Sequence, residues 1–200
     1  MDIILNENEL SRFLEYHSLN GFAIISASRH ENTSKINKEK TNELKNILKK
    51  SQFSYKFVIG GYKEDVLEND KPTGKKRTVK EDSFIIYNKT KNGEIPKKNK
   101  LFKFALNLCN KFEQDSILYS ENGDKPRYYK QNGEIDSSFN NKKYTINDVN
   151  AEYFTQFDHK KSIKIPRQRF TLNYEEPDDN FTFMQDRAKD ILSRKKIFNY

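Results

Sequence analysis

The sequence predicts an α+β fold, built on a four-stranded sheet of the split βαβ (ferredoxin-like) type with two helices. An N-terminal helix precedes this unit, and a β-rich C-terminal extension that ends in a helix follows it. Two observations predict the fold. Short apolar segments typical of strands are separated by two longer segments in which apolar residues recur at helical spacing. Their order is strand, helix, strand, strand, helix, strand, which is that of two βαβ-like halves in series.

The first half of the unit follows a short helix predicted over residues 6–18, which Asn6 is placed to cap. "FAIISAS" (22–28) is a run of apolar and small residues typical of a buried strand. Residues 34–51 place apolar side chains on one helical face and Lys, Glu and Asn on the other. "SYKFVIGGYKE" (54–64) alternates as a strand does, and its glycine pair predicts a bulge or a close approach of another group.

The second half begins after a polar, Lys-rich segment over 65–80, which is predicted to be a loop. "DSFIIYN" (82–88) is the third strand, and a second basic loop follows over 89–100. Residues 99–112 have the clearest helical periodicity in the chain. "SILYS" (116–120) is the fourth strand.

The pattern changes after Glu121, so we predict a core domain over 1–121 and an extension over 122–200 packed on it. A chain of 200 residues is long enough for one compact domain with such an appendage. "RYYKQNGEI" and "KKYTIND" are predicted to be strand pieces around turns, since Asn-Gly is a strong turn signal. "RQRFTLNY" is predicted to be a strand, and residues 180–198 a terminal helix.

The formal net charge is +8, which has two interpretations. One is attraction to nucleic acid or another polyanion. The other is coding bias, since Lys and Asn are both heavily used. Lys far outnumbers Arg, and Arg is the better specific reader of phosphates and bases. The coding-bias interpretation is therefore slightly favoured.

The single cysteine, Cys109, falls on the apolar stripe of the helix over 99–112 and is expected to be buried. One cysteine cannot form a disulfide within the chain, which fits a reducing compartment. The N-terminus has no secretory signal, and no stretch approaches the length of a membrane span. We expect a cytoplasmic protein with no membrane partner, located in the host cytoplasm if a phage encodes it.

Polar side chains gather where the four predicted strands share an edge. In a split βαβ sheet of spatial order 4-1-3-2, the ends of the first two strands lie beside the beginnings of the last two. The side chains expected at this edge are Ser26, Ser28, Arg29, Asn37, Tyr62, Glu81, Ser83, Gln114 and Asp115.

The chemistry of this edge is open to two interpretations. The N-terminus of the helix that starts near residue 34, with Arg29 beside it, would accept a phosphate or carboxylate. Glu81 and Asp115 are candidates for catalytic acid and base, or for oxygen ligands of a metal. In the structural interpretation, Ser28 or Ser34 caps the helix, Glu81 only pairs with Arg29, and Gln114 and Asp115 satisfy loop backbone groups. The structural interpretation is favoured for each residue alone, and the two are equal for the group. No specific metal site and no cofactor is predicted.

A separate set of basic residues suits single-stranded nucleic acid, where cations contact phosphates and rings stack on bases. It comprises Lys75, Lys76, Arg77, Arg167 and Arg169. Its alternative is a solvated strand face. The sequence has no Gly-rich phosphate loop, no dinucleotide-binding fingerprint and no His-x-x-x-His zinc pattern.

Four segments carry a family resemblance: "ISASR", "GGYKE", "KEDSFII" and "FEQDSILY". They resemble a family of small bacterial and bacteriophage proteins catalogued only as a domain of unknown function, over roughly residues 20–120. The resemblance implies a phage or mobile-element origin and no established activity. Its motifs match this chain at Ser28, Asn37, Asn42, Glu81, Ser83 and Gln114.

Three functions follow from these observations, in order of preference. The first is an accessory protein that binds nucleic acid or a nucleotide-like anion and interferes with host machinery, as in anti-defence. The second is a small enzyme acting on a phosphate-bearing or nucleotide substrate. The third is an interaction module that sequesters a host protein. The sequence leaves open whether the protein is an enzyme.

Overall fold

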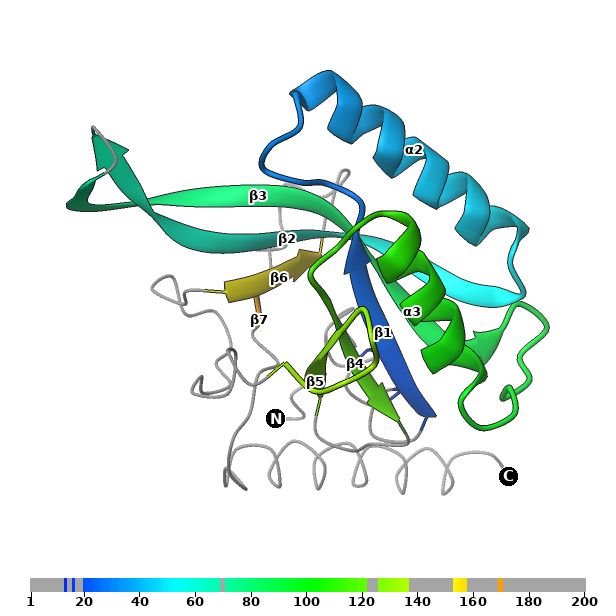
Figure 1. The fold of residues 1–200 in the computed structure, drawn as a ribbon. Coiled ribbons are helices and arrows are strands. Elements are labelled where there is room, and N and C mark those ends of the chain that lie inside the picture. The colour runs from blue at the N-terminus through cyan, green and yellow to red at the C-terminus, as the bar shows by residue number, and fades with distance from the viewer. Residues whose placement is uncertain are drawn as a thin grey trace, which may run out of the picture.

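The structure is a computed structural model of the 200-residue chain. It describes residues 13, 16, 20–68, 71–121, 126–136, 153–157 and 169–170. The elements in chain order are β1 (Gly21–Ser26), α2 (Ser34–Lys50), β2 (Phe53–Glu68), β3 (Lys71–Thr90), α3 (Lys100–Lys111), β4 (Ser116–Glu121), β5 (Arg127–Lys130), β6 (Tyr153–Phe157) and β7 (Arg169–Phe170) (Figure 1). The predicted α+β class is confirmed.

The strands form one sheet of seven strands in the order β5-β4-β1-β3-β2-β6-β7, and every neighbouring pair is antiparallel. β1 lies between β3 and β4, with Ser26 opposite Ser83 at one end. Helices α2 and α3 lie on the same face of this sheet (Figure 1). One apolar core joins Leu44 and Leu48 of α2 with α3 and with the facing side chains of β1, β3 and β4.

The other face of the sheet is covered in part by residues of the predicted N-terminal helix. Phe13 is 1% exposed, and its ring packs edge-on against Phe22 of β1 at 4.9 Å between centroids. Tyr16 packs against Tyr87 of β3. Phe13 and Tyr16 are helical, while the rest of the segment 6–18 lies outside the described residues.

The segment 65–80 was predicted to be a loop, and this prediction is wrong. β2 runs to Glu68, and β3 starts at Lys71, so the two strands form a long hairpin paired from Phe53 with Thr90 to Glu68 with Lys71. Its outer part projects beyond the sheet (Figure 1), and its side chains from 74 to 78 are exposed. A strand exposed on both faces needs no apolar alternation, so its charged sequence resembled a loop.

Beyond residue 121, three short strands join the same sheet. β5 falls inside the predicted "RYYKQNGEI" and pairs with β4. β6 pairs with β2 at Val58 to Tyr62, in a stretch where no strand was predicted. β7 falls inside the predicted "RQRFTLNY". The predicted "KKYTIND" strand and the terminal helix lie outside the described residues.

Cys109 is fully buried among the core side chains, as its position on the helix predicted. Its thiol lies 3.1 Å from the carbonyl oxygen of Gln114. Burial raises the pKa of the Cys109 thiol to about 11. A thiol with this pKa is almost entirely protonated at neutral pH and is a poor nucleophile.

Within the described part of the chain, no helix is both long enough and apolar enough to cross a membrane.

Lys91 closes the C-terminal end of α2. Its ammonium lies 3.4, 2.6 and 2.5 Å from the carbonyl oxygens of Leu48, Lys49 and Ser51, respectively. These carbonyls carry the negative end of the helix dipole, and the last of them have no partner within the helix.

We therefore expect Lys91→Met to lower the free energy of unfolding by about 1 kcal/mol, because it removes a cation from a helix C-terminus while keeping the apolar stem. Urea denaturation measures this change. The matched control is Lys98→Met, which removes an exposed lysine from the loop before α3 and should change stability by less than about 0.5 kcal/mol. Equal stability of the two variants would contradict the capping role of Lys91.

Candidate functional site

The turn between β1 and α2 is held by side-chain amides from two separate elements. Asn37, in the first turn of α2, accepts a hydrogen bond from the N–H of Arg29 at 2.9 Å and donates one to its carbonyl oxygen at 2.9 Å. Gln114, just before β4, donates to the carbonyl oxygen of Ser28 at 3.1 Å. The Ser26 hydroxyl accepts from the N–H of Ser28 and donates to the carbonyl oxygen of Asp82. The turn is therefore fixed to both α2 and the strand edge.

Two adjoining pockets open at this turn. The first, which we call the acidic pocket, has a volume of about 320 Å³. The second, the basic pocket, has a volume of about 460 Å³. Both are lined by Ser28, Arg29, His30, Tyr62 and Glu81. These five residues form the wall that the two pockets share.

The remaining charged groups divide between the pockets by sign. Glu31 and Asp115 line the acidic pocket only. Lys38, Arg77 and Lys80 line the basic pocket only, together with the single added carboxylate of Asp82. The site therefore presents a predominantly negative compartment beside a predominantly positive one.

Glu81, in the wall that the two pockets share, has a carboxyl group with a raised pKa. It lies on β3 opposite Gly60 of β2. Burial raises the pKa of the Glu81 carboxyl, while the nearby Ser26 hydroxyl and the charge of His30 lower it in part. Because desolvation is the largest of these effects, ionisation of Glu81 is unfavourable in the folded protein. A positively charged group that enters the pocket would stabilise the ionised carboxylate. A carboxyl of this kind is suited to proton transfer or to binding a cation.

Arg29 forms an ion pair with Glu31 and not with Glu81, contrary to the structural interpretation of the sequence. The Arg29 side chain is 24% exposed, and the carboxylates of Glu31, Asp115 and Glu113 favour its charged form. His30 also contacts Glu31, with 3.1 Å between its Nδ1 and the Glu31 carboxylate. An anion that binds Arg29 must therefore compete with Glu31.

Gly60 of β2 leaves room for the Ser83 side chain of β3. A Cβ built at Gly60 would lie 2.8 Å from the hydroxyl of Ser83, which is itself only 4% exposed. A close approach was predicted at Gly60 from its sequence, and the neighbouring group is the Ser83 side chain.

The structure brings most of the sequence-predicted edge together. Six of these residues line the acidic pocket: Ser28, Arg29, Tyr62, Glu81, Gln114 and Asp115. Asn37 lines the basic pocket. Ser26 and Ser83 line neither pocket. Their hydroxyls donate instead to backbone carbonyl oxygens of β3, Ser26 to that of Asp82 and Ser83 to that of Glu81 at 3.5 Å.

The site contains five charged or titratable residues that were not chosen from the sequence: His30, Glu31, Lys38, Lys80 and Asp82. The first two follow Arg29 directly, so their place in the predicted turn was a usable signal. Lys38 lies one residue after Asn37 at the start of α2. Lys80 falls in the basic segment over 65–80, which was assigned to a loop, and Asp82 is the first residue of the third predicted strand.

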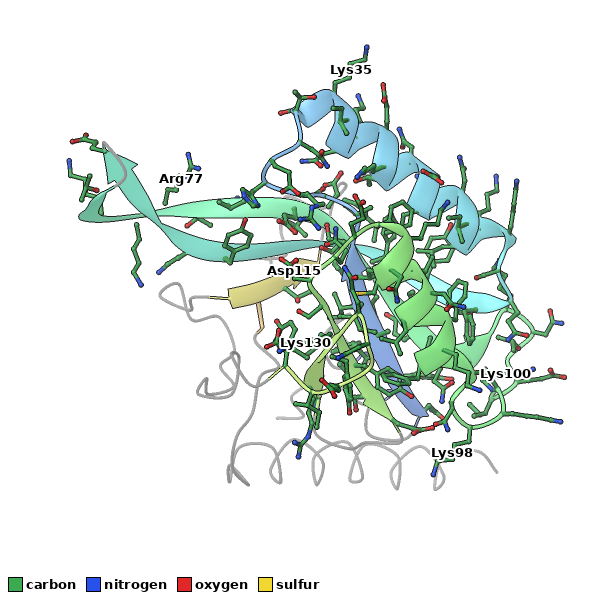
Figure 2. All side chains as sticks on the ribbon, viewed as in Figure 1. Lys35, Arg77, Lys98, Lys100, Asp115 and Lys130 are labelled. Carbon is green, nitrogen blue, oxygen red and sulfur yellow. The ribbon has the colours of Figure 1, made fainter. Side chains whose placement is uncertain are left out.

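Of the residues predicted to bind nucleic acid, the structure describes Lys75, Lys76 and Arg77 together on the projecting hairpin. Lys75 and Lys76 are exposed on the projecting hairpin, and Arg77 lines the basic pocket. Figure 2 shows Arg77 on this hairpin, while Lys98 and Lys100 of the second basic segment lie on the opposite side of the molecule. Arg167 lies outside the described residues, and Arg169 is described only by its backbone in β7.

Among the residues that the structure describes, no group of three or more His, Cys, Asp or Glu side chains is arranged to hold a metal ion.

The comparisons with known proteins correct the family interpretation. The model of the S-Adenosylmethionine lyase family matches residues 23–176, whereas no curated protein matches the chain. The resemblance to a domain of unknown function was wrong, because the matched family is a named one. The preferred reading as a phage accessory protein for nucleic-acid binding and anti-defence is also overturned, since the match favours the alternative of a small enzyme acting on a nucleotide-like substrate. The matched range contains both pockets, and the chain belongs to the S-adenosylmethionine lyase family.

Proposed function

We propose that this protein cleaves S-adenosylmethionine at the acidic and basic pockets, by a lyase reaction in which water is not a reactant. The observation that carries the proposal is the pair of adjoining pockets of opposite charge with Glu81 in their shared wall, inside the range that matches the family.

The charges of the two pockets complement those of the substrate. S-adenosylmethionine carries a sulfonium and an ammonium, which are cations, and one carboxylate. Three carboxylates, from Glu31, Glu81 and Asp115, line the acidic pocket. The lysines and arginines of the basic pocket suit the substrate carboxylate. We therefore assign the cationic groups to the acidic pocket and the carboxylate to the basic pocket.

A sulfonium is reactive because the C–S bond breaks with its electron pair moving to sulfur, which leaves as a neutral thioether. Two routes balance without water. In one, a base removes a proton from the carbon adjacent to the one that carried sulfur, and the electrons of that C–H bond form an alkene as the C–S bond breaks. In the other, the substrate's own carboxylate oxygen bonds to the carbon that carried sulfur, and a ring closes. Both routes release the thioether nucleoside 5′-methylthioadenosine.

Glu81 has a role in either route. In the elimination, its carboxylate accepts the proton, for which a pKa raised by burial is favourable. In the ring closure, no protein base is needed, and Glu81 binds the cationic part of the substrate. The second role acts mainly on binding, because the positive charge disappears as the C–S bond breaks.

We also infer that the core is a split βαβ unit. The order β4-β1-β3-β2 within the sheet, with antiparallel neighbours, supports this inference. So does the position of α2 between β1 and β2 and of α3 between β3 and β4 in the chain.

Turnover by the purified protein tests the proposed function. S-adenosylmethionine should yield 5′-methylthioadenosine, measured by liquid chromatography, in proportion to time and enzyme. S-adenosylhomocysteine has a neutral sulfur and serves as the control that should stay intact. Absence of the nucleoside, or equal turnover of the two compounds, would contradict the proposal.

A further inference from the structure

We infer that Asn37 is a positioning residue, which holds the Arg29 backbone so that Arg29 and His30 line the two pockets. The expected effect on turnover rests on the proposed function. The fixing of the Arg29 backbone rests only on the hydrogen bonds of the turn. Asn37 was predicted from the sequence as a ligand-binding residue, and its contacts indicate an indirect role.

The Asn37 side chain uses both ends of its amide on one residue. Its Oδ1 accepts from the N–H of Arg29, and its Nδ2 donates to the carbonyl oxygen of Arg29, both at 2.9 Å. An amide offers an acceptor and a donor side by side, which an ionised carboxylate cannot do. Asn32 adds a second donor to Oδ1 at 3.2 Å. The oxygen that a ligand would need is therefore already in use.

The carbonyl of Ser28, just before Arg29, is held by a second side-chain amide. Gln114 Nε2 donates to the carbonyl oxygens of Ser28 and Phe112. The ladder between β1 and β3 ends at Ser26, so the backbone of Ser28 and Arg29 has no strand to pair with there. Two side-chain amides, one from α2 and one from the segment after α3, provide these partners.

We call the two hydrogen bonds between the Asn37 amide and the Arg29 backbone the clamp. The variant Asn37→Asp tests the clamp alone, because Asp has nearly the same shape as Asn. The carboxylate keeps an oxygen where Oδ1 accepts, and it replaces the Nδ2 donor with a second oxygen facing the Arg29 carbonyl. The two oxygens repel, so the turn should open more often. Asp in the first turn of a helix is otherwise favourable, because it complements the helix dipole. The variant should therefore fold while its turn is loosened.

The test compares Asn37→Asp with Asn46→Asp by hydrogen exchange, melting temperature and steady-state kinetics. Asn46 is an exposed residue of the same helix, placed on its opposite side, so it is a matched control. We expect Asn37→Asp to speed exchange of the Arg29 amide about tenfold. It should also lower kcat/KM for S-adenosylmethionine by about 10- to 100-fold, because small misplacements of binding groups have effects of this size. The control should change neither quantity.

Unchanged exchange at Arg29 would overturn the clamp, whatever the kinetics. Faster exchange with unchanged kcat/KM would overturn its role in positioning. If the wild-type protein does not cleave S-adenosylmethionine at all, the proposed function fails, while the exchange result still decides the clamp. Should Asn37→Asp not fold, Asn37→Ser gives the same readouts, since one hydroxyl cannot replace both amide hydrogen bonds.

Discussion

Glu81→Gln is expected to lower kcat/KM for S-adenosylmethionine by roughly 100-fold or more, as for loss of a catalytic base or a buried charge partner. The amide of Gln has nearly the shape of the carboxyl, so the pockets keep their form. The variant loses the negative charge and the ability to accept a proton. Steady-state assays of 5′-methylthioadenosine release measure the change.

The same variant is expected to keep or raise the melting temperature at neutral pH. Burial raises the pKa of Glu81 above its ordinary value of 4.5, so the folded state binds this proton more tightly than the unfolded state. Wild-type stability then falls as pH rises from about 4.5 to the raised pKa, where the folded protein loses that proton. Gln has no such loss, so its advantage over wild type should grow across this interval.

The control for both effects is Glu94→Gln, which alters an exposed glutamate in the turn after β3. It should change neither kcat/KM nor the pH dependence of stability. A Glu81→Gln variant with full activity and a lowered melting temperature would show that Glu81 is a structural residue.

The division of the effect between kcat and KM separates the two roles of Glu81. A base acts in the transition state, so its loss lowers kcat. A group that only binds the sulfonium or ammonium stabilises the bound substrate, so its loss raises KM.

Phe84→Ala is expected to lower the free energy of unfolding by about 3–5 kcal/mol, as truncation of a fully buried Phe usually does. Phe84 is 0% exposed on the central strand β3. Its ring meets those of Tyr55 and Phe57 at 6.0 and 5.6 Å between centroids. The loss is a large share of the roughly 5–15 kcal/mol that stabilises a typical domain.

Urea denaturation of Phe84→Ala measures this loss, and Phe84→Leu is its matched control. Leu keeps an apolar side chain at the position and should be less destabilising than Ala. A loss below about 1 kcal/mol in the Ala variant would contradict the placement of Phe84 in a close-packed core. Because Phe84 lies three residues after Glu81 on the same strand, an intact core also fixes the site.

Apolar patterning predicted the buried elements well. The helix predicted over 34–51 is α2 (Ser34–Lys50), and the one predicted over 99–112 is α3 (Lys100–Lys111). Each of these helices buries one face against the sheet, so the spacing of its apolar residues predicts the helix. The gathering of polar residues at one edge was also predictable, because it depends only on strand order and on where each strand begins and ends.

The parts that sequence reasoning missed have physical reasons. The outer hairpin is exposed on both faces, so its charged residues carry no strand pattern. The amides of Asn37 and Gln114 bond backbone groups, and residue type alone does not distinguish that use from ligand binding. The raised pKa of Glu81 depends on its burial in the folded protein, which residue type does not reveal. The four short motifs of the chain suggested another family, whereas the family match spans residues 23–176.

The central claim, that S-adenosylmethionine is cleaved without water as a reactant, is tested most directly by turnover in ¹⁸O-labelled water. The proposed lyase reaction predicts release of 5′-methylthioadenosine with no ¹⁸O bonded to the carbon that carried sulfur. A later opening of a ring product at its carbonyl would place the label in the carboxyl group instead. Label on the carbon that carried sulfur would identify a hydrolase and contradict the account.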